Sequence, residues 1–195
     1  VMNEKLMRGQ EIVKKRFGAT IRNLDFKDLK ADIEVLKDLY NRSWEKNWGA
    51  VAMTNEEFDF LADDLVQVLG KKFRDFVFFI ELNGEPAGFA LVLPDLNQIL
   101  IDNKGGHIIP AVWKLKTQTD KIKWARILVL GVLPEYRGKG LDVLMYYTVV
   151  TRAAEKGIYF GEASWVLENN TMMNRGAELM NGERYKEYRI WEKDI

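Results

Sequence analysis

The sequence has 195 residues, 47% of them apolar, which is typical of a globular domain large enough to bury its own core. Its 29 lysines and arginines equal its 29 aspartates and glutamates, so it lacks the basic excess of most nucleic-acid-binding proteins. It contains no cysteine and one histidine, His107, which excludes disulfides, thiol catalysis and metal sites built from several cysteines or histidines.

The first half is expected to form helices followed by a hairpin. Thr54, with Glu57 three residues later, is a capping-box signature that opens a helix, and Gly70 is placed to close it. Asn83-Gly84 lies between two apolar runs, which favours a tight hairpin turn. The predicted elements are helices at residues 3–17, 28–48 (ended by Gly49) and 54–70, and strands at residues 19–24, 76–82 and 87–93.

The second half alternates between strands and helices. A near-continuous apolar run at residues 126–133 predicts a strand buried on both faces, and an apolar stripe from Leu141 to Ala153 predicts an amphipathic helix. Residues 95–124 show little pattern beyond a short helix near Trp113. The remaining predicted elements are a strand at 158–166, a helix at 171–180 and a strand at 183–191. This order predicts an α/β (α+β) fold in which helices flank one mixed, twisted sheet.

The turn after the 126–133 strand carries the most specific chemistry. Pro134 ends the strand, and Gly138 and Gly140 lead directly into the next helix. Unbonded amides at a helix start, with glycines that permit close backbone approach, form a cradle for an anion, and Arg137 and Lys139 add positive charge. A pyrophosphate suits such a cradle. The glycine spacing matches neither the dinucleotide-binding G-x-G-x-x-G motif nor the P-loop.

On these residues the chain resembles the GNAT superfamily of N-acyltransferases, which use acetyl-coenzyme A. The family signature is V-x-P-x-x followed by [RQ]-x-x-G-x-[GA], and Val132, Pro134 and residues 137–142 occupy its places. Asp142 departs from the signature, because glycine or alanine is usual there. The resemblance covers about residues 19–192. It implies the acyl-CoA N-acyltransferase fold, with residues 1–18 as an N-terminal extension and residues 19–195 as a single domain.

The resemblance also implies where coenzyme A or acetyl-CoA binds. The backbone of Leu130 and Val132, beside a bulge at Gly131, is expected to pair with the pantetheine arm. The thioester is expected in a wedge between this strand and the 158–166 strand, where Asn170 or Asn174 would hydrogen-bond the pantetheine. The amides implied to hold the pyrophosphate are those of Arg137, Gly138, Lys139, Gly140, Leu141 and Asp142.

Catalysis in this family usually needs a base for the amine and a donor for the departing thiolate. The donor is often a tyrosine four residues before the glycine that closes the helix after the wedge, and this place holds Glu178 here. Tyr185 or Tyr188 is therefore predicted as a substitute, with solvent as the alternative. Glu168 is predicted as the base if partial burial raises its pKa; alternatively, it is a carboxylate favoured by a helix dipole.

Five residues are predicted to line the acceptor pocket: Trp44, Trp48, Asp95, Asn97 and Trp165. Tryptophans at helical spacing also suit a core, and polar residues after a strand also suit a turn. His107 is either a base or a surface residue. The cations at residues 114–126 form either a solvated face or a contact for the 3′-phosphate of coenzyme A or an acidic partner.

These features predict an N-acyltransferase that moves an acetyl or short acyl group from coenzyme A to the amine of a small molecule or peptide. The alternative is a non-catalytic acyl-CoA-binding or scaffold domain, which the missing tyrosine favours. No apolar run is long enough to span a membrane, and no signal-peptide core is present. We therefore expect a cytoplasmic protein without a metal, nucleic-acid or membrane partner, either as a homodimer or as part of a longer chain.

Overall fold

One five-stranded sheet forms the centre of the molecule, which the computed structural model describes for residues 2–45 and 51–193. Its strands, in sheet order, are β1 (Ala19–Asn23), β2 (Val77–Leu82), β3 (Glu85–Pro94), β4 (Trp124–Val132) and β5 (Phe160–Ala163). The helices are α1 (Glu4–Phe17), α2 (Leu29–Trp44), α3 (Asn55–Leu69), α4 (Asn97–Leu100), α5 (Ile108–Thr117), α6 (Leu141–Glu155) and α7 (Thr171–Leu179). The mixed sheet flanked by helices confirms the predicted fold class.

Local sequence signals explain how the sheet is connected. Asn83 and Gly84 adopt φ values of 54° and 84°, the left-handed conformation that a two-residue hairpin turn between β2 and β3 requires. Neighbouring strands are antiparallel except for β4 and β5, which run parallel because α6 crosses over between them. The predicted capping box is present, since Thr54 and Glu57 bond each other's backbone at the start of α3.

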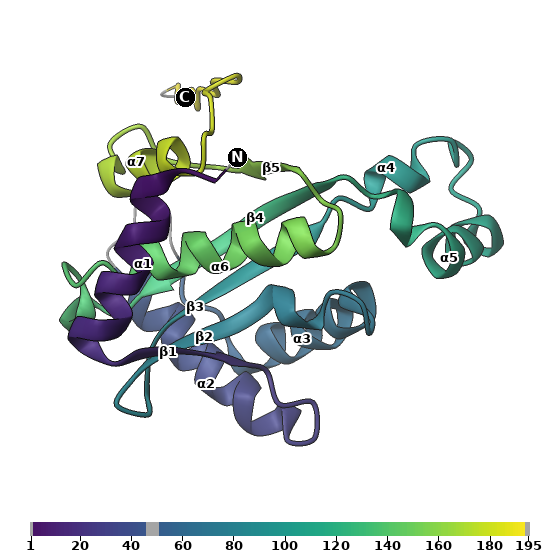
Figure 1. Cartoon of the computed structure of the whole chain (residues 1–195). Helices are drawn as coiled ribbons and strands as arrows, with labels where there is room; N and C mark the ends of the chain where they lie inside the picture. The colour runs from purple at the N-terminus through teal and green to yellow at the C-terminus, as the bar shows by residue number, and fades with distance from the viewer. Residues whose placement is uncertain (1, 46–50, 194–195) are drawn as a thin grey trace.

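Helices cover both faces of the sheet. Helices α1 and α6 pack together on one face, and α2 and α3 lie on the other (Figure 1). Between them, the β2 side chains Phe78, Phe79 and Ile80 are fully buried. Helix α1 approaches α6 closely, because a Cβ atom on Gly9 would lie 2.8 Å from Cγ1 of Val143.

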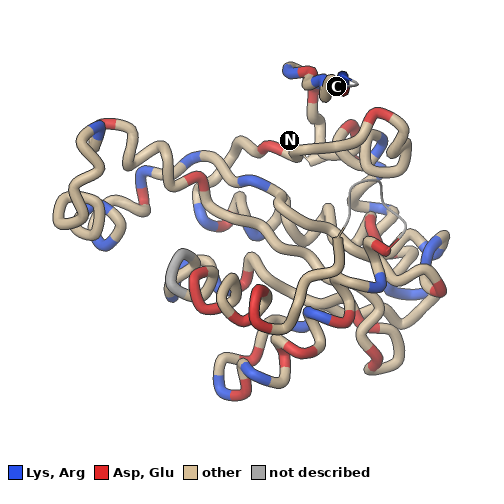
Figure 2. Tube along the Cα trace, turned by 180° about the vertical axis from the view of Figure 1, so that it is seen from behind, with Lys and Arg blue, Asp and Glu red and all other residues tan. Residues whose placement is uncertain are grey.

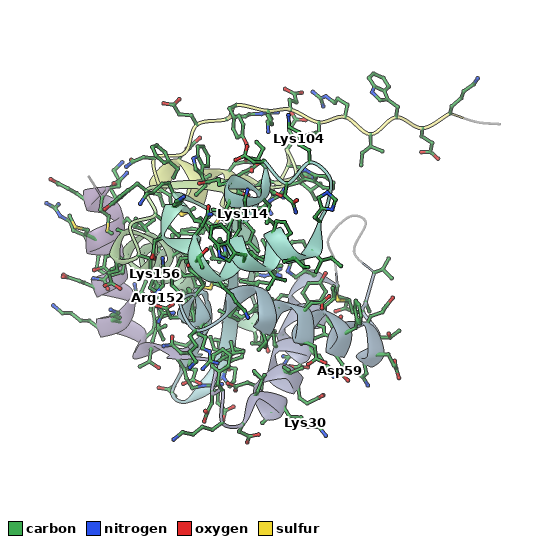
Figure 3. All side chains as sticks on the ribbon, turned by 90° about the vertical axis from the view of Figure 1, so that its right-hand side faces the viewer. Lys30, Asp59, Lys104, Lys114, Arg152 and Lys156 are labelled. Carbon is green, nitrogen blue, oxygen red and sulfur yellow. The ribbon has the colours of Figure 1, made fainter. Side chains whose placement is uncertain are left out.

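The predicted final strand at residues 183–191 is wrong. These residues are exposed and belong to no strand, and Figure 3 shows the C-terminal segment running away from the body of the molecule. Strand β5 is also shorter than predicted, since it ends at Ala163. Alternation of polar and apolar residues indicates a strand only where a neighbouring strand is available, and this segment lies clear of the sheet. The sequence pattern alone does not reveal that.

The connection between β3 and β4 forms an arm that projects beyond the sheet (Figure 1). It contains the helix predicted near Trp113, which is α5, and a short helix that was not predicted, α4. None of the helices in the described ranges has the length and apolar character needed to cross a membrane.

Candidate active site

The predicted wedge exists where β4 and β5 diverge. The two strands pair only over Trp124–Ile127 and Phe160–Ala163. Beyond Ile127, β4 is paired with β3 alone among the described residues. The amide of Leu133 donates to the carbonyl oxygen of Ala87 in β3. Because the backbone N–H and C=O groups of successive strand residues point to opposite edges, those of Leu130 and Val132 point toward the open edge. Those are the two residues predicted to pair with the pantetheine.

The bulge expected at Gly131 lies elsewhere. Gly131 pairs regularly with Phe89, and the register instead shifts between Ile127 and Val129, which leaves Leu128 as the extra residue. Gly131 is small for a different reason. A Cβ atom there would lie 2.7 Å from the ring of Phe89 and 3.0 Å from Oγ of Ser43, so the glycine lets α2 approach the sheet.

The turn before α6 has the geometry of an anion cradle. Gly138 and Gly140 both adopt left-handed φ values, 77° and 74°, which side chains rarely tolerate. Among the described residues, the amides of residues 138–142 donate to no main-chain carbonyl. Together with the positive end of the 15-residue helix α6, these amides fit a pyrophosphate group.

Helix α1 supports the cradle from behind. Val13 is buried, and a Cβ atom on Gly140 would lie 3.2 Å from its Cγ2 atom. A hollow of about 560 Å³ adjoins the turn, with Arg16, Asn83, Tyr136 and Lys139 among its lining residues. Arg16 comes from the last turn of α1, so the first 17 residues contribute to the surroundings of the cradle.

The two cations predicted beside the cradle have different positions. The Arg137 guanidinium turns back from the cradle and donates to the carbonyl oxygens of Val132 and Ser43, at 3.2 and 2.9 Å. Arg137 therefore fastens the end of β4 to α2 and occupies the Val132 carbonyl that was expected to face the pantetheine. The Lys139 ammonium lies 5.0 Å from the centre of the Tyr136 ring and lines the hollow.

Asp142 places a carboxylate in the first turn of α6. Burial raises the pKa of its carboxyl, while hydrogen bonds from the amides of Asp142 and Val143 lower that pKa by less. The carboxylate thus interacts with its own backbone amide, which a pyrophosphate in the cradle would also use. One turn further along, burial and the charge of Asp142 raise the pKa of Tyr146, whose hydroxyl faces Met173 in α7 at 3.7 Å.

The two asparagines predicted to contact the pantetheine stabilise the start of α7. Asn170 caps the helix, because its side-chain oxygen accepts from the Met173 amide at 3.1 Å. The amide nitrogen of Asn174 donates to the carbonyl oxygens of Leu167, Glu168 and Asn170. These contacts order the loop between β5 and α7.

The predicted catalytic residues all lie at the surface. Glu168 is exposed and forms an ion pair with Arg189 at 3.2 Å, so it lacks the burial on which its role as a base depended. Tyr185 and Tyr188 are about equally exposed, at 61% and 60%, in the C-terminal segment. Glu178, in the place of the usual tyrosine, is an exposed residue of α7.

The predicted acceptor residues do not form one pocket. Asp95 and Asn97 lie at the arm end of the sheet, where the Asp95 amide donates to Trp124, the first residue of β4. Trp44 stacks on Tyr40 at the end of α2, next to Ser43, which lies against Gly131. Trp124 and Gly131 are seven positions apart on β4, which corresponds to about 23 Å along the strand. Trp165 is 80% exposed beyond β5, and Trp48 lies outside the described residues.

Other candidate residues lie on the arm. His107 is exposed at the start of α5, beside the Gly105-Gly106 turn. Lys114 and Lys116 lie on α5. The other cations of residues 114–126 lie around the N-terminal end of β4, whereas the cradle follows the C-terminal end of that strand. A contact of this run with the 3′-phosphate or an acidic partner stays a prediction.

Among the cations of residues 114–126, Arg126 has a structural role that the sequence analysis did not predict. Its guanidinium is half-buried and donates to Oγ of Ser164 twice, at 2.9 and 2.6 Å. This contact ties β4 to the residue that follows β5, where the wedge opens. A long-range pair of this kind leaves no local pattern in the sequence.

Comparison with known proteins defines the class of this protein. Residues 33–175 match the model of the acetyltransferase (GNAT) family. The chain therefore belongs to the GNAT family, a class of acyltransferases, which confirms the resemblance inferred from Val132, Pro134 and the glycine turn.

Among its relatives, the chain is 34% identical over 187 residues to the bacterial ceramide synthase of Caulobacter vibrioides, covering 91% of this chain and 47% of that protein. It is 30% identical over 185 residues to Protein YghO of Escherichia coli, covering 90% and 46%. The chain thus spans about half the length of these relatives.

Solved structures of low sequence identity share the fold. The aminoglycoside acetyltransferase AAC(6')-Iy, solved with a CoA bisubstrate analogue, superposes with a TM-score of 0.58 at 15% identity, over 91% of this chain and 99% of that one. A Clostridium difficile protein described as a possible acetyltransferase superposes with a TM-score of 0.56 at 12% identity, over 91% and 97%.

Proposed function

We propose that this protein is an N-acyltransferase that binds acyl-coenzyme A along β4 and transfers its acyl group to an amine. The observation that carries this proposal is the continuity of the open β4 edge with the amides of residues 138–142, which donate to no main-chain carbonyl among the described residues. A strand edge suits an amide-containing pantetheine arm, and the cradle suits a pyrophosphate. Membership of the GNAT family supports the same function.

Acyl-coenzyme A supplies an activated thioester when bound. In this proposal, the amides of residues 138–142 hold the pyrophosphate, and the backbone of Leu130 and the amide of Val132 align the pantetheine. The wedge, fixed at its base by Arg126 and Ser164, then receives the thioester. The acceptor amine attacks the carbonyl carbon, a C–N bond forms, the C–S bond breaks, and the sulfur takes up a proton. Positioning alone supplies much of the acceleration in such a reaction.

For the acceptor, we propose the primary amine of a long-chain amino alcohol. A relative that is 34% identical to this chain is named a bacterial ceramide synthase, and this supports the proposed acceptor because a ceramide is an N-acylated long-chain amino alcohol. Aminoglycoside acceptors occur among structural neighbours of about 15% identity, a similarity that reflects the fold alone.

The test measures release of free coenzyme A with acetyl-CoA and a long-chain acyl-CoA as donors. Acceptors are a long-chain amino alcohol, an aminoglycoside and a lysine-containing peptide, and Gly140→Glu is the control that lacks the cradle. We expect transfer to the long-chain amine. Transfer only to the aminoglycoside or peptide would refute the proposed acceptor and leave the N-acyltransferase.

A specific observation favours a second candidate, a non-catalytic acyl-CoA-binding domain. Glu168 and Tyr185 are both exposed, and α7 has Glu178 where a tyrosine is usual. This candidate predicts that coenzyme A raises the melting temperature, because it binds the native state, while no acceptor accelerates thiol release. Any acceptor-dependent thiol release that Gly140→Glu abolishes would exclude it.

A further inference from the structure

The arm presents an apolar surface that the fold does not use. We define the arm as residues 95–123, which carry α4 and α5 beyond the sheet (Figure 1). Four residues of α5 form an exposed apolar row, with exposed fractions in parentheses: Ile108 (77%), Ile109 (84%), Val112 (44%) and Trp113 (59%). Ile101, at the end of α4, is 70% exposed. Helical geometry places the four α5 residues on one face of the helix.

Packing of the arm is provided by other residues. Ile99 and Ile122 are buried, and Leu96, Leu100 and Leu115 pack against the core cluster. Within α5, Leu115 is the residue that packs against the core cluster, and no residue of α5 is fully buried. Single exposed apolar residues are common, but four large ones on one face of a helix mark a surface that binds something.

The arm that carries this apolar surface has an excess of positive charge. The arm contains five lysines and three aspartates. Lys104 lies near its tip, Lys116 follows the apolar row on α5, and Lys114 lies 4.0 Å from Asp102. Figure 2 shows blue segments at several points along the arm, and Figure 3 looks directly at this end of the molecule, with Lys104 and Lys114 on it.

A basic hollow lies at the base of the arm. It has a volume of about 320 Å³, and its lining includes four cationic side chains: Lys71, Lys72, Arg74 and Lys156. Lys72 pairs with Asp120 of the arm, so the hollow and the arm adjoin. One lining anion, Asp75, pairs with Lys156 at 3.0 Å, whereas the buried Nε atom of Arg74 has no acceptor among the described residues. The hollow thus offers cationic groups to an anionic ligand.

We propose that the arm docks the protein onto an anionic phospholipid bilayer. The apolar row on α5 enters the interface between headgroups and acyl chains, and Lys104, Lys116 and the basic hollow contact lipid phosphates. An amphipathic helix with tryptophan and isoleucine on one face and lysines around it is suited to lie in this interface. The proposal replaces the expectation that the protein has no membrane partner, and it does not depend on the proposed catalytic function.

The charges favour a bilayer over a second copy of the chain. Two arms packed by their apolar rows would bring the same lysines together, which costs energy, whereas anionic headgroups attract them.

Co-sedimentation with vesicles tests the proposal. The vesicles contain phosphatidylcholine alone or with phosphatidylglycerol, and we expect binding to the anionic vesicles that weakens with salt. The double variant Ile108→Asp with Ile109→Asp should weaken binding by about a hundredfold or more, because it places charges in the apolar row. The matched control is Ile12→Asp, an exposed isoleucine on α1, which should bind as the parent does.

Three further variants test the electrostatic and the apolar contacts with the bilayer separately. Lys104→Ala and Lys116→Ala should each weaken binding to anionic vesicles by about fivefold, since a lysine near such a surface contributes about that factor. Brominated lipids should quench Trp113, and Trp113→Phe should remove most of that quenching. Absence of parent binding to anionic vesicles would overturn the proposal, as would undiminished binding of the double isoleucine variant. A parent dimer that this variant dissociates, without vesicle binding, would show instead that the arm joins two chains.

Discussion

Replacing Asp142 by asparagine removes the one negative charge in the first turn of α6 while keeping the shape of the side chain. Two unit charges 4 Å apart interact with about 1 kcal/mol in water and about 4 kcal/mol near a protein surface. The half-buried Asp142 carboxylate interacts with the amide of Val143 and with its own amide, which is one of the cradle amides. We therefore expect Asp142→Asn to bind coenzyme A about tenfold more tightly at neutral pH, which corresponds to about 1.4 kcal/mol.

The difference between the two proteins should depend on pH. Burial raises the pKa of Asp142, so its carboxylate takes up a proton at a higher pH than an ordinary aspartate does. Below that pKa the parent also lacks the charge, and its affinity should approach that of Asp142→Asn. The raised pKa of Asp142 also makes the free energy of unfolding depend on pH. A carboxyl with a raised pKa disfavours the folded state once it ionises, so the free energy of unfolding of the parent should fall relative to the variant as pH rises through this range.

Isothermal titration with coenzyme A between acidic and slightly alkaline pH measures the affinity of both proteins, and urea titrations at the same pH values measure their free energies of unfolding. Glu155→Gln, which removes an exposed carboxylate from the opposite end of α6, is the control and should leave affinity unchanged. Weaker binding by a folded Asp142→Asn would refute the reasoning and show that the carboxylate contributes positively to the site. So would a gain in affinity that persists unchanged at low pH.

Three more substitutions test the site. Gly140→Glu forces a charged side chain into the cradle at a φ of 74° and should abolish the rise in melting temperature that coenzyme A produces, whereas a full rise in a folded variant would contradict the cradle. Because Glu168 is exposed, Glu168→Gln should leave turnover within about twofold of the parent, whereas a loss of about a hundred- to ten-thousand-fold would show that Glu168 acts as the base. Ser164→Ala leaves the half-buried Arg126 guanidinium without its acceptor and should lower the free energy of unfolding by about 1–3 kcal/mol in urea titrations; an unchanged value would mean that the guanidinium finds another partner.

The sequence predicted the features that depend on neighbouring residues. The turn at Asn83-Gly84, the capping box at Thr54 and the glycine turn before α6 follow from φ preferences and hydrogen bonds within a few positions. The apolar stripe from Leu141 identifies α6 and its buried face in the same way. Together these local signals predicted the order of the elements up to α7, apart from the short helix α4, and the location of the glycine turn.

Contacts between distant segments were not readable from the sequence. Arg137 was predicted to supply charge to the cradle, but the end of α2 lies close enough for its guanidinium to bond Ser43. Gly131 suggested a bulge, but it is small because Ser43 and Phe89 press against it, and the bulge falls at Leu128. Each of these outcomes depends on which helix packs on which strand.

The C-terminal segment and the arm show what tertiary structure alone decides. Residues 183–191 alternate as a strand does, but pairing needs a neighbour, and this segment lies away from the sheet, exposed together with Tyr185. The sequence predicted a short helix near Trp113 without indicating which of its apolar residues are covered. In the structure, Leu115 packs against the core cluster, whereas Ile108 and Ile109 face solvent. Periodicity specifies that a helix has an apolar face, but the position of the helix in the fold determines whether that face is covered, because burial is a property of the surroundings.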